Sequence, residues 1–68
     1  MARVTLKAAR VNAGLKQSQV AQALKVNPKT IWSWENGKSA PNIQKVGELC
    51  ELYKLTYDDI IFLPDNSL

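Results

Sequence analysis

The chain has no histidine, a single cysteine and no long apolar run, and each shortage excludes a class of protein. Without histidine, and with only one cysteine, it cannot assemble the usual ligand sets of a zinc site, and the commonest general acid–base residue of enzymes is missing. It also has no glycine-rich phosphate loop and no pair of carboxylates in a plausible cleft. We therefore expect no enzyme, no metal site and no cofactor.

No stretch of the sequence approaches the roughly 18 apolar residues that are needed to cross a bilayer, and the N-terminus lacks the apolar region of a signal peptide. We therefore expect a cytoplasmic protein with no membrane partner. Cys50 cannot form an internal disulfide and falls within a helical apolar stripe, so a reduced core thiol is expected there. The 68 residues suffice for one domain, spanning 1–68 with its core at about 5–63.

Acidic residues are missing from the first half of the chain. Residues 1–34 contain six Lys or Arg and no Asp or Glu, whereas all six acids lie between Glu35 and Asp65. The net charge is only +3, but this uneven distribution favours a polyanion as the partner of the cationic half. Charge alone does not distinguish such a partner from a merely basic surface.

Four segments have the apolar spacing and the end signals of helices, and we expect helices over residues 6–13, 17–24, 28–35 and 43–53. Thr5, Asn27 and Asn42 precede three of these segments, and their side chains favour the start of a helix. Gly14 and the pair Asn36-Gly37 follow two of them and favour the end of a helix.

A fifth, short helix is expected from Thr56 through about Phe62, because Thr56 with Asp59 resembles a capping box and Pro64 follows. Gly47 lies within the fourth helix, where it is unfavourable by roughly 1 kcal/mol relative to alanine, so it predicts a close approach between helices. No segment alternates apolar and polar residues with the period of a strand. The expected fold class is all-α, a compact domain of five helices.

The second and third helices are joined by a turn at Lys25 and Val26 that is too tight for ordinary bundle packing. The third helix begins with Pro28, at the position where the missing N–H of proline costs nothing. Its outer face has no acidic residue before Glu35. This is the layout of a helix-turn-helix, over about residues 17–36, in which one helix enters the major groove of DNA.

At about 100° per residue, the third helix has an inner and an outer side. Ile31 and Trp34 fall on the inner side and are expected in the core. Lys29 can donate to guanine and Asn27 can pair with adenine, whereas an exposed Trp32 fits a DNA contact, a protein contact or a ring folded over the helix. The residues expected to contact DNA bases are Asn27, Pro28, Lys29, Trp32 and Ser33.

Polar residues next to the second helix and after the third are candidates for contacts with DNA phosphates. The free N–H groups at the start of the second helix can bind a phosphate oxygen, with the Gln17 side chain assisting. Each of these residues alone is weak evidence for a phosphate contact. Together they indicate one, because they are predicted to lie on the same side of the protein surface. The phosphate-contacting candidates are Lys16, Gln17, Asn36 and Lys38.

With these residues in place, the chain resembles the phage repressor and Cro-like (lambda-repressor-like, XRE-type) helix-turn-helix family. The resemblance implies a compact five-helix domain whose second helix lies over the DNA backbone while the third enters the major groove. The matching positions are Gly14-Leu15, Gln17, Val20-Ala21, Leu24, Val26, Thr30-Ile31, Glu35-Asn36-Gly37-Lys38, Pro41, Leu49, Leu55 and Asp58 to Ile61.

The resemblance also assigns Arg10 and Glu35 to an internal ion pair that ties the first helix to the end of the third. The sequence pattern supports the same ion pair, because both residues lie at the edge of an apolar face, where a partly buried charge needs a partner of opposite charge. The chain departs from the family pattern in three places. Lys16 replaces the usual Thr or Ser cap, Pro28 replaces a polar residue that reads a base, and Trp32 replaces a small residue.

We therefore expect a sequence-specific transcription regulator, a small repressor of phage or prophage type, that binds a pseudo-palindromic operator in double-stranded DNA as a homodimer. The alternative is an antitoxin-like or other protein-binding helix-turn-helix module that also represses its own operon, with Trp32 and the apolar C-terminus as its partner surface. The apolar residues near the C-terminus exceed what one short helix can bury, so we expect them to form the dimer surface. They are Tyr57, Ile60, Ile61, Phe62 and Leu63.

Overall fold

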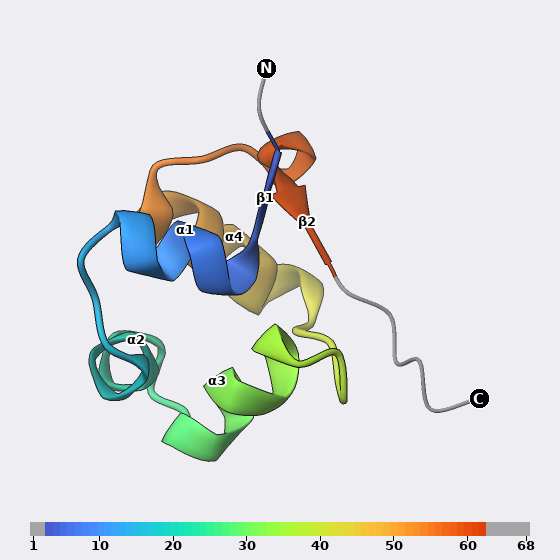
Figure 1. Ribbon diagram of the computed structural model, residues 1–68. Helices are drawn as coiled ribbons and strands as arrows, with labels where there is room; N and C mark the ends of the chain where they lie inside the picture. The colour runs from blue at the N-terminus through green and yellow to red at the C-terminus, as the bar shows by residue number, and fades with distance from the viewer. Residues whose placement is uncertain (1–2, 63–68) are drawn as a thin grey trace.

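The computed structural model describes residues 3–62, and within them it contains four α-helices, one turn of 3-10 helix and two short strands. α2 and α3 lie at one end of the molecule, and the two strands lie at the other (Figure 1). In chain order the elements are β1 (Val4–Thr5), α1 (Leu6–Asn12), α2 (Gln17–Leu24), α3 (Pro28–Glu35), α4 (Ile43–Tyr53), η1 (Tyr57–Asp59) and β2 (Ile60–Ile61).

Side-chain caps start three of the four helices, as the sequence predicts. The side-chain oxygens of Thr5, Asn27 and Asn42 each accept a hydrogen bond of 2.8–3.1 Å from a backbone N–H two or three residues later. α2 starts differently, because the ammonium group of Lys16 can only donate hydrogen bonds and so cannot accept one from the backbone N–H groups of α2. There the backbone N–H of Lys16 donates to Gln19 Oε1 at 2.8 Å instead. The predicted bounds of these helices are confirmed to within one residue.

All four α-helices are ended or followed by a residue in the left-handed region. Gly14 after α1 has φ +73, and Gly37 after α3 has φ +74, which glycine adopts at no steric cost. Lys25 and Lys54, which end α2 and α4, have φ of 59 and 58. A side chain in this region costs roughly 1–2 kcal/mol, so these two lysines carry a local penalty.

The expected fifth helix is wrong. After one turn of 3-10 helix, Ile60 adopts extended dihedrals and β2 pairs in parallel with β1, with Val4 opposite Ile60 and Thr5 opposite Ile61. The bond from the backbone N–H of Thr56 to Asp59 Oδ2 is present at 3.0 Å, but the helix that it caps is only this single turn. So short a helix is marginal, and two β-branched isoleucines favour a strand once partners are available.

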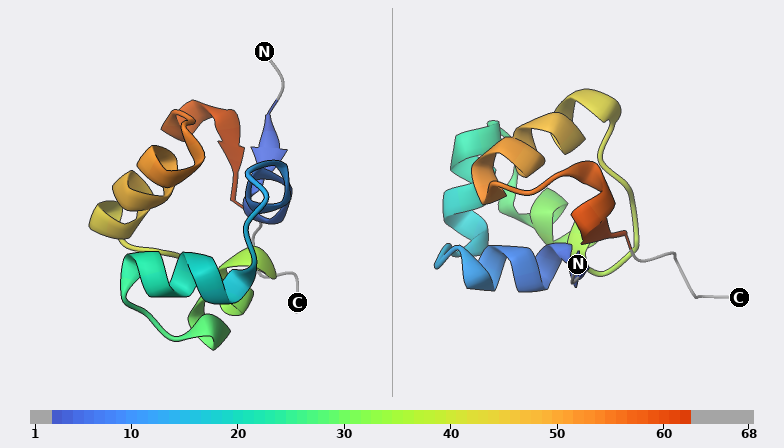
Figure 2. Two further views of the ribbon diagram at one scale, coloured as in Figure 1. Left: turned by 90° about the vertical axis from the view of Figure 1, so that its left-hand side faces the viewer. Right: turned by 90° about the horizontal axis from the view of Figure 1, so that it is seen from above.

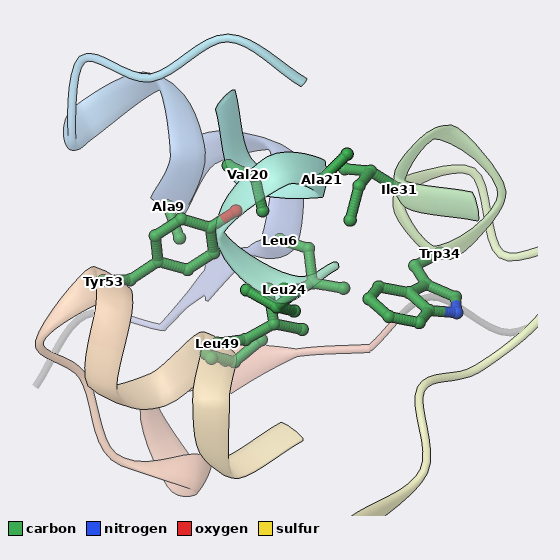
Figure 3. Close-up of a cluster of buried hydrophobic side chains, with 10 residues drawn as sticks. Leu6, Ala9, Val20, Ala21, Leu24, Ile31, Trp34, Leu49 and Tyr53 are labelled. Carbon is green, nitrogen blue, oxygen red and sulfur yellow. The ribbon is translucent and has the colours of Figure 1, made fainter. Parts of the chain in front are cut away.

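The core lies between the four helices and β2, and each of these elements contributes to it (Figure 3). Ile31 and Trp34 of α3 are buried, which confirms the predicted inner side of that helix. Ile31, Leu49 and Val20 are among the largest side chains that are fully enclosed. The ten core residues are Leu6, Ala9, Val20, Ala21, Leu24, Ile31, Trp34, Leu49, Tyr53 and Ile60.

Gly47 is not at a close helix approach, contrary to the expectation from the sequence. A Cβ built on Gly47 meets no atom within 4 Å, and the residue is exposed. The other glycine in open space, Gly14, is required by its backbone conformation. Nothing in the surroundings of Gly47 explains its presence in α4.

Candidate nucleic-acid interface

The turn between α2 and α3 is held by backbone bonds that close the end of α2. With Lys25 in the left-handed conformation, the N–H of Val26 reaches back to the carbonyl of Ala21 at 2.9 Å. Asn27 then caps α3, so α3 begins three residues after the left-handed Lys25. α2 and α3 consequently pack closely at an angle, and they lie together at one end of the molecule (Figures 1 and 2).

The outer side of α3 is exposed, as its position in the helix predicts. Asn27, Pro28 and Lys29 are exposed, Ser33 is half-buried, and Trp32 is 44% exposed. The Asn27 side chain is engaged by the N–H of Lys29 at 2.8 Å, which leaves its amide NH₂ as the group that can donate outward. The five base-contacting candidates therefore lie at the start of α3 or along its outer side.

Glu35, the one acid of α3, is turned into the protein and is only 6% exposed. Its carboxylate accepts from Arg10 Nε at 2.7 Å and from Arg10 Nη2 at 3.3 Å, so the ion pair between α1 and α3 is present. Arg10 Nη1 also donates to the carbonyl of Leu15 at 3.0 Å. The hydrogen bond with Glu35 raises the pKa of Arg10 against the opposing effect of burial. The buried pair keeps negative charge away from the outer side of α3.

Gln17 joins the same network, which spacing in the sequence did not indicate. Its Nε2 donates to Glu35 Oε1 at 3.0 Å, so three segments meet at one carboxylate. The second N–H of the Gln17 amide stays available beside the start of α2. The two residues are 18 positions apart, and no local pattern signals such a contact.

The remaining phosphate-contacting candidates lie near the ends of α2 and α3. Lys16 precedes α2 and is exposed, and Lys38 follows α3 and is exposed. Asn36 ends α3, and its Nδ2 donates to the carbonyl of Trp32 at 2.8 Å. The first backbone N–H groups of α2 have no acceptor within the helix and point out from its start. These groups and the outer side of α3 belong to the same end of the molecule (Figure 1).

The dimerisation candidates are separated by the structure. Ile60 is only 1% exposed and belongs to the core, so its assignment to a dimer surface is wrong; pairing with β1 turns its side chain inward. Tyr57 and Ile61 are exposed, and Phe62 is half-buried with its ring stacked on Tyr57 at a centroid distance of 5.4 Å. Leu63 lies outside the described residues.

Titratable groups elsewhere show the effect of burial. Burial raises the pKa of the Cys50 thiol, and burial together with the nearby Glu35 charge raises the pKa of Tyr53 to about 12. Hydrogen bonds from Thr56 lower the pKa of Asp59.

In residues 3–62 no three acidic, histidine or cysteine side chains gather where they could hold a metal ion. No helix in this range is long and apolar enough to cross a membrane.

One family model matches the chain, and it is described as a helix-turn-helix that covers residues 6–60. No curated protein and no solved structure matches the chain significantly. The matched range includes all four helices and ends at the first residue of β2. Members of this family are DNA-binding regulatory domains and are not typically enzymes. The chain therefore belongs to the Cro/C1-type, XRE-like helix-turn-helix family.

Proposed function

We propose that this protein is a sequence-specific regulator of transcription, a small repressor of phage or prophage type, that reads double-stranded DNA with α3 in the major groove. The observation that carries the proposal is the division of α3: Ile31, Trp34 and Glu35 are buried, while its outer side is free of acidic residues. A helix anchored in this way can present one side to a polyanion without repulsion. The chain then acts by binding and not by catalysis, and needs no cofactor.

Sequence is read in this proposal by the side chains at the start and along the outer side of α3. Lys29 donates to guanine O6 or N7, and the free amide NH₂ of Asn27 donates to an acceptor on a base edge. Trp32 offers an apolar surface to thymine methyl groups and sugars. Ser33 is a short donor and acceptor, and Pro28 makes van der Waals contact only.

Phosphates are held by groups on either side of α3. Gln17 donates through the amide N–H that Glu35 leaves available, next to the first N–H groups of α2. Lys16 and Lys38 supply positive charge, and Asn36 lies at the end of α3. Because phosphate contacts carry no sequence information, these residues set affinity and register for every duplex alike.

One domain of this size reads only half of a typical operator. Two copies on a pseudo-palindrome, with their centres one helical turn apart, provide the missing contacts. The 68 residues form a single domain in this proposal, with the helix-turn-helix at about residues 17–36. We propose that the two copies form a homodimer at least when they are bound to DNA.

The test compares two alanine substitutions on selected and random duplexes. Lys29→Ala is expected to relax the preference among sites, because a base contact is lost, while Gln17→Ala is expected to weaken binding to all sequences alike. Lys54→Gly is the matched control: it removes one positive charge at the end of α4 that lies away from α3 (Figure 2), and glycine accepts the left-handed backbone there.

Binding constants are measured by fluorescence anisotropy at several salt concentrations. The lysine control is expected to change affinity only slightly and the ranking of sites not at all. If Lys29→Ala leaves the ranking of sites unchanged, the assignment of Lys29 to a base is wrong. If the wild-type chain shows neither site preference nor a steep salt dependence, the proposed function itself fails.

A second candidate function is favoured by the exposure of Trp32, which is large for an apolar ring on a free surface. In this alternative the chain is an antitoxin-like module that binds a protein partner and represses its own operon. The two functions differ in a simple experiment. A stand-alone regulator binds its operator alone with a steep salt dependence, whereas a protein-binding module co-purifies with a partner that protects Trp32 from quenching.

A further inference from the structure

The side chains that α3 offers to DNA differ in the hydrogen bonds that they can make. Four of the five base-contacting candidates are exposed, and we call these four the reading side of α3: Asn27, Pro28, Lys29 and Trp32. An ammonium group only donates hydrogen bonds, an indole donates through its single N–H, and a proline side chain does neither. The side chains of Pro28, Lys29 and Trp32 therefore contain no hydrogen-bond acceptor.

Asn27 carries the one side-chain acceptor of the reading side, and the start of α3 uses it. Its Oδ1 accepts from the backbone N–H of Lys29 at 2.8 Å. A bidentate contact with adenine needs the oxygen and the NH₂ of the amide together, one at N6 and the other at N7. Because the oxygen is turned back to the helix, only the NH₂ can meet a base while the cap is kept. The reading side thus presents donors and no free acceptor.

The reading side also carries an apolar strip. Pro28 and Trp32 are four residues apart in α3, so they are neighbours on one side of the helix. Trp32 is exposed even though its indole is large and mostly apolar. In the major groove, the C5-methyl group of thymine is the one apolar group that distinguishes the four bases. The strip can therefore remove a thymine methyl group from water, which is favourable.

We propose that α3 recognises its operator through the keto bases, guanine and thymine, and does not read the exocyclic amino groups of adenine and cytosine. Its donors meet O6 and N7 of guanine or O4 of thymine, and its apolar strip covers the thymine methyl group. This inference rests on the proposed function and names the class of half-site that the reading side selects. Every base pair contains one keto base, so the contacted atoms, and not the composition of the site, distinguish this proposal.

Ser33 is the fifth base-contacting candidate and the exception, because its hydroxyl group accepts as well as donates. It is half-buried, and it follows Trp32 directly in α3. Ser33 can therefore add one contact with an amino group in each half-site. Ser33→Ala removes this acceptor, so in that variant no amino group of the operator is expected to contribute to affinity.

The first experiment changes single atoms of an operator that the wild-type chain selects from random duplexes. Deoxyuridine removes the methyl group of a thymine, 7-deazaguanine removes the N7 acceptor of a guanine, and 2-aminopurine moves the amino group of an adenine to the minor groove. Each base of one half-site is replaced in turn, and affinity is measured by fluorescence anisotropy.

One buried methyl group predicts a loss of about fourfold for at least one deoxyuridine. One bond to a charged donor predicts a loss of about tenfold or more for at least one 7-deazaguanine. With Ser33→Ala, every 2-aminopurine is expected to change affinity by less than about threefold, since no acceptor meets the amino group that it displaces.

Two variants assign these losses to residues. In Trp32→Ala the apolar strip is cut, so thymine and deoxyuridine are expected to bind alike, while the loss with 7-deazaguanine remains. Lys29→Met nearly keeps the length of the side chain and removes its donor, so it is expected to show the reverse pattern. Both residues are exposed, and circular dichroism checks that each variant is folded.

The sharpest variant is Asn27→Asp, which exchanges the donor at the start of α3 for an acceptor and keeps the cap. Aspartate caps helices as well as asparagine does, so one carboxylate oxygen can accept from the N–H of Lys29 while the other meets the base. The added charge is expected to weaken binding to all duplexes. At one position of each half-site, the preference is expected to change by about tenfold toward a base with an amino group, such as cytosine. Asn42→Asp is the matched control, because it adds the same charge at the cap of α4, and it is expected to leave every preference unchanged.

Three results overturn the inference. They are a wild-type chain whose affinity no deoxyuridine lowers, a Ser33→Ala chain whose affinity a 2-aminopurine lowers by more than about threefold, and an Asn27→Asp chain that keeps the wild-type preference. In each of these cases a selected operator exists, so the regulator stands and only the proposed way in which α3 reads it is wrong. If selection yields no preferred duplex, the proposed function itself fails, and the inference fails with it.

Discussion

Gly14 and Gly47 provide a test in which the same substitution is expected to have opposite effects. A Cβ at either glycine meets no atom within 4 Å, so neither alanine causes a clash. The two sites differ in backbone conformation, because Gly14 has φ +73 after α1 whereas Gly47 lies inside α4. Gly47→Ala is expected to stabilise the protein and Gly14→Ala to destabilise it.

The magnitudes follow from the backbone. In a helix interior, alanine is better than glycine by about 1 kcal/mol. In the left-handed region alanine loses roughly 1–2 kcal/mol, which a less flexible unfolded chain offsets by about 0.4–1 kcal/mol. For 68 residues at about 2.1 cal/mol/K each, the entropy of melting is roughly 0.14 kcal/mol/K. Gly47→Ala should therefore raise the Tm by about 7 °C, and Gly14→Ala, with a central net loss of about 0.8 kcal/mol, should lower it by roughly 6 °C.

Thermal melts followed by circular dichroism at 222 nm measure both changes, with urea unfolding as an independent value. The double variant should lie near the wild type, since neither added Cβ meets any atom within 4 Å, so the two sites share no contact and their effects should add. A Gly47→Ala protein that melts at or below the wild-type temperature refutes the argument. It would mean that the exposed side of α4 near Gly47 is covered by something that a methyl group displaces.

Three further changes test other parts of the structure. Arg10→Met leaves the carboxylate of Glu35 buried without its partner and should cost roughly 3–5 kcal/mol in urea unfolding, part of which Glu35→Leu in the same chain should restore; a cost below about 1 kcal/mol contradicts the buried pair. Lys25→Gly should stabilise the protein by several tenths of a kcal/mol or more, because φ is 59 there, and Lys25→Ala should not. The pKa of Tyr53 is raised from 10 to about 12, so the stability that this tyrosine contributes is complete below pH 10 and is lost as the pH rises through 12; a Tyr53→Phe protein should lose less stability over that range, as urea midpoints at pH 9, 10 and 11 will reveal.

Local signals in the sequence were sufficient for the helix-turn-helix. The caps Asn27 and Asn42, the glycine after α1 and the division of α3 into two sides depend on neighbours within four residues, so they could be read directly. The same local information identified the outer side of α3. The family match over residues 6–60 agrees with that interpretation.

Long-range contacts decided what the sequence did not show. Ile60 and Ile61 form a strand because Val4 and Thr5, 56 residues away, are beside them, and a local capping signal at Thr56 could not reveal that pairing. Gln17 donates to Glu35 across 18 residues.

Exposure is likewise a property of the assembled molecule. Ile43 has the spacing of a buried residue and stands free, and Gly47 has space around it where a close approach was expected. Helix starts and ends are set by hydrogen bonds between residues that are close in the sequence, so the sequence alone predicts them. The burial of a side chain depends on which segments, distant in the sequence, pack against it, and only the tertiary structure determines that packing.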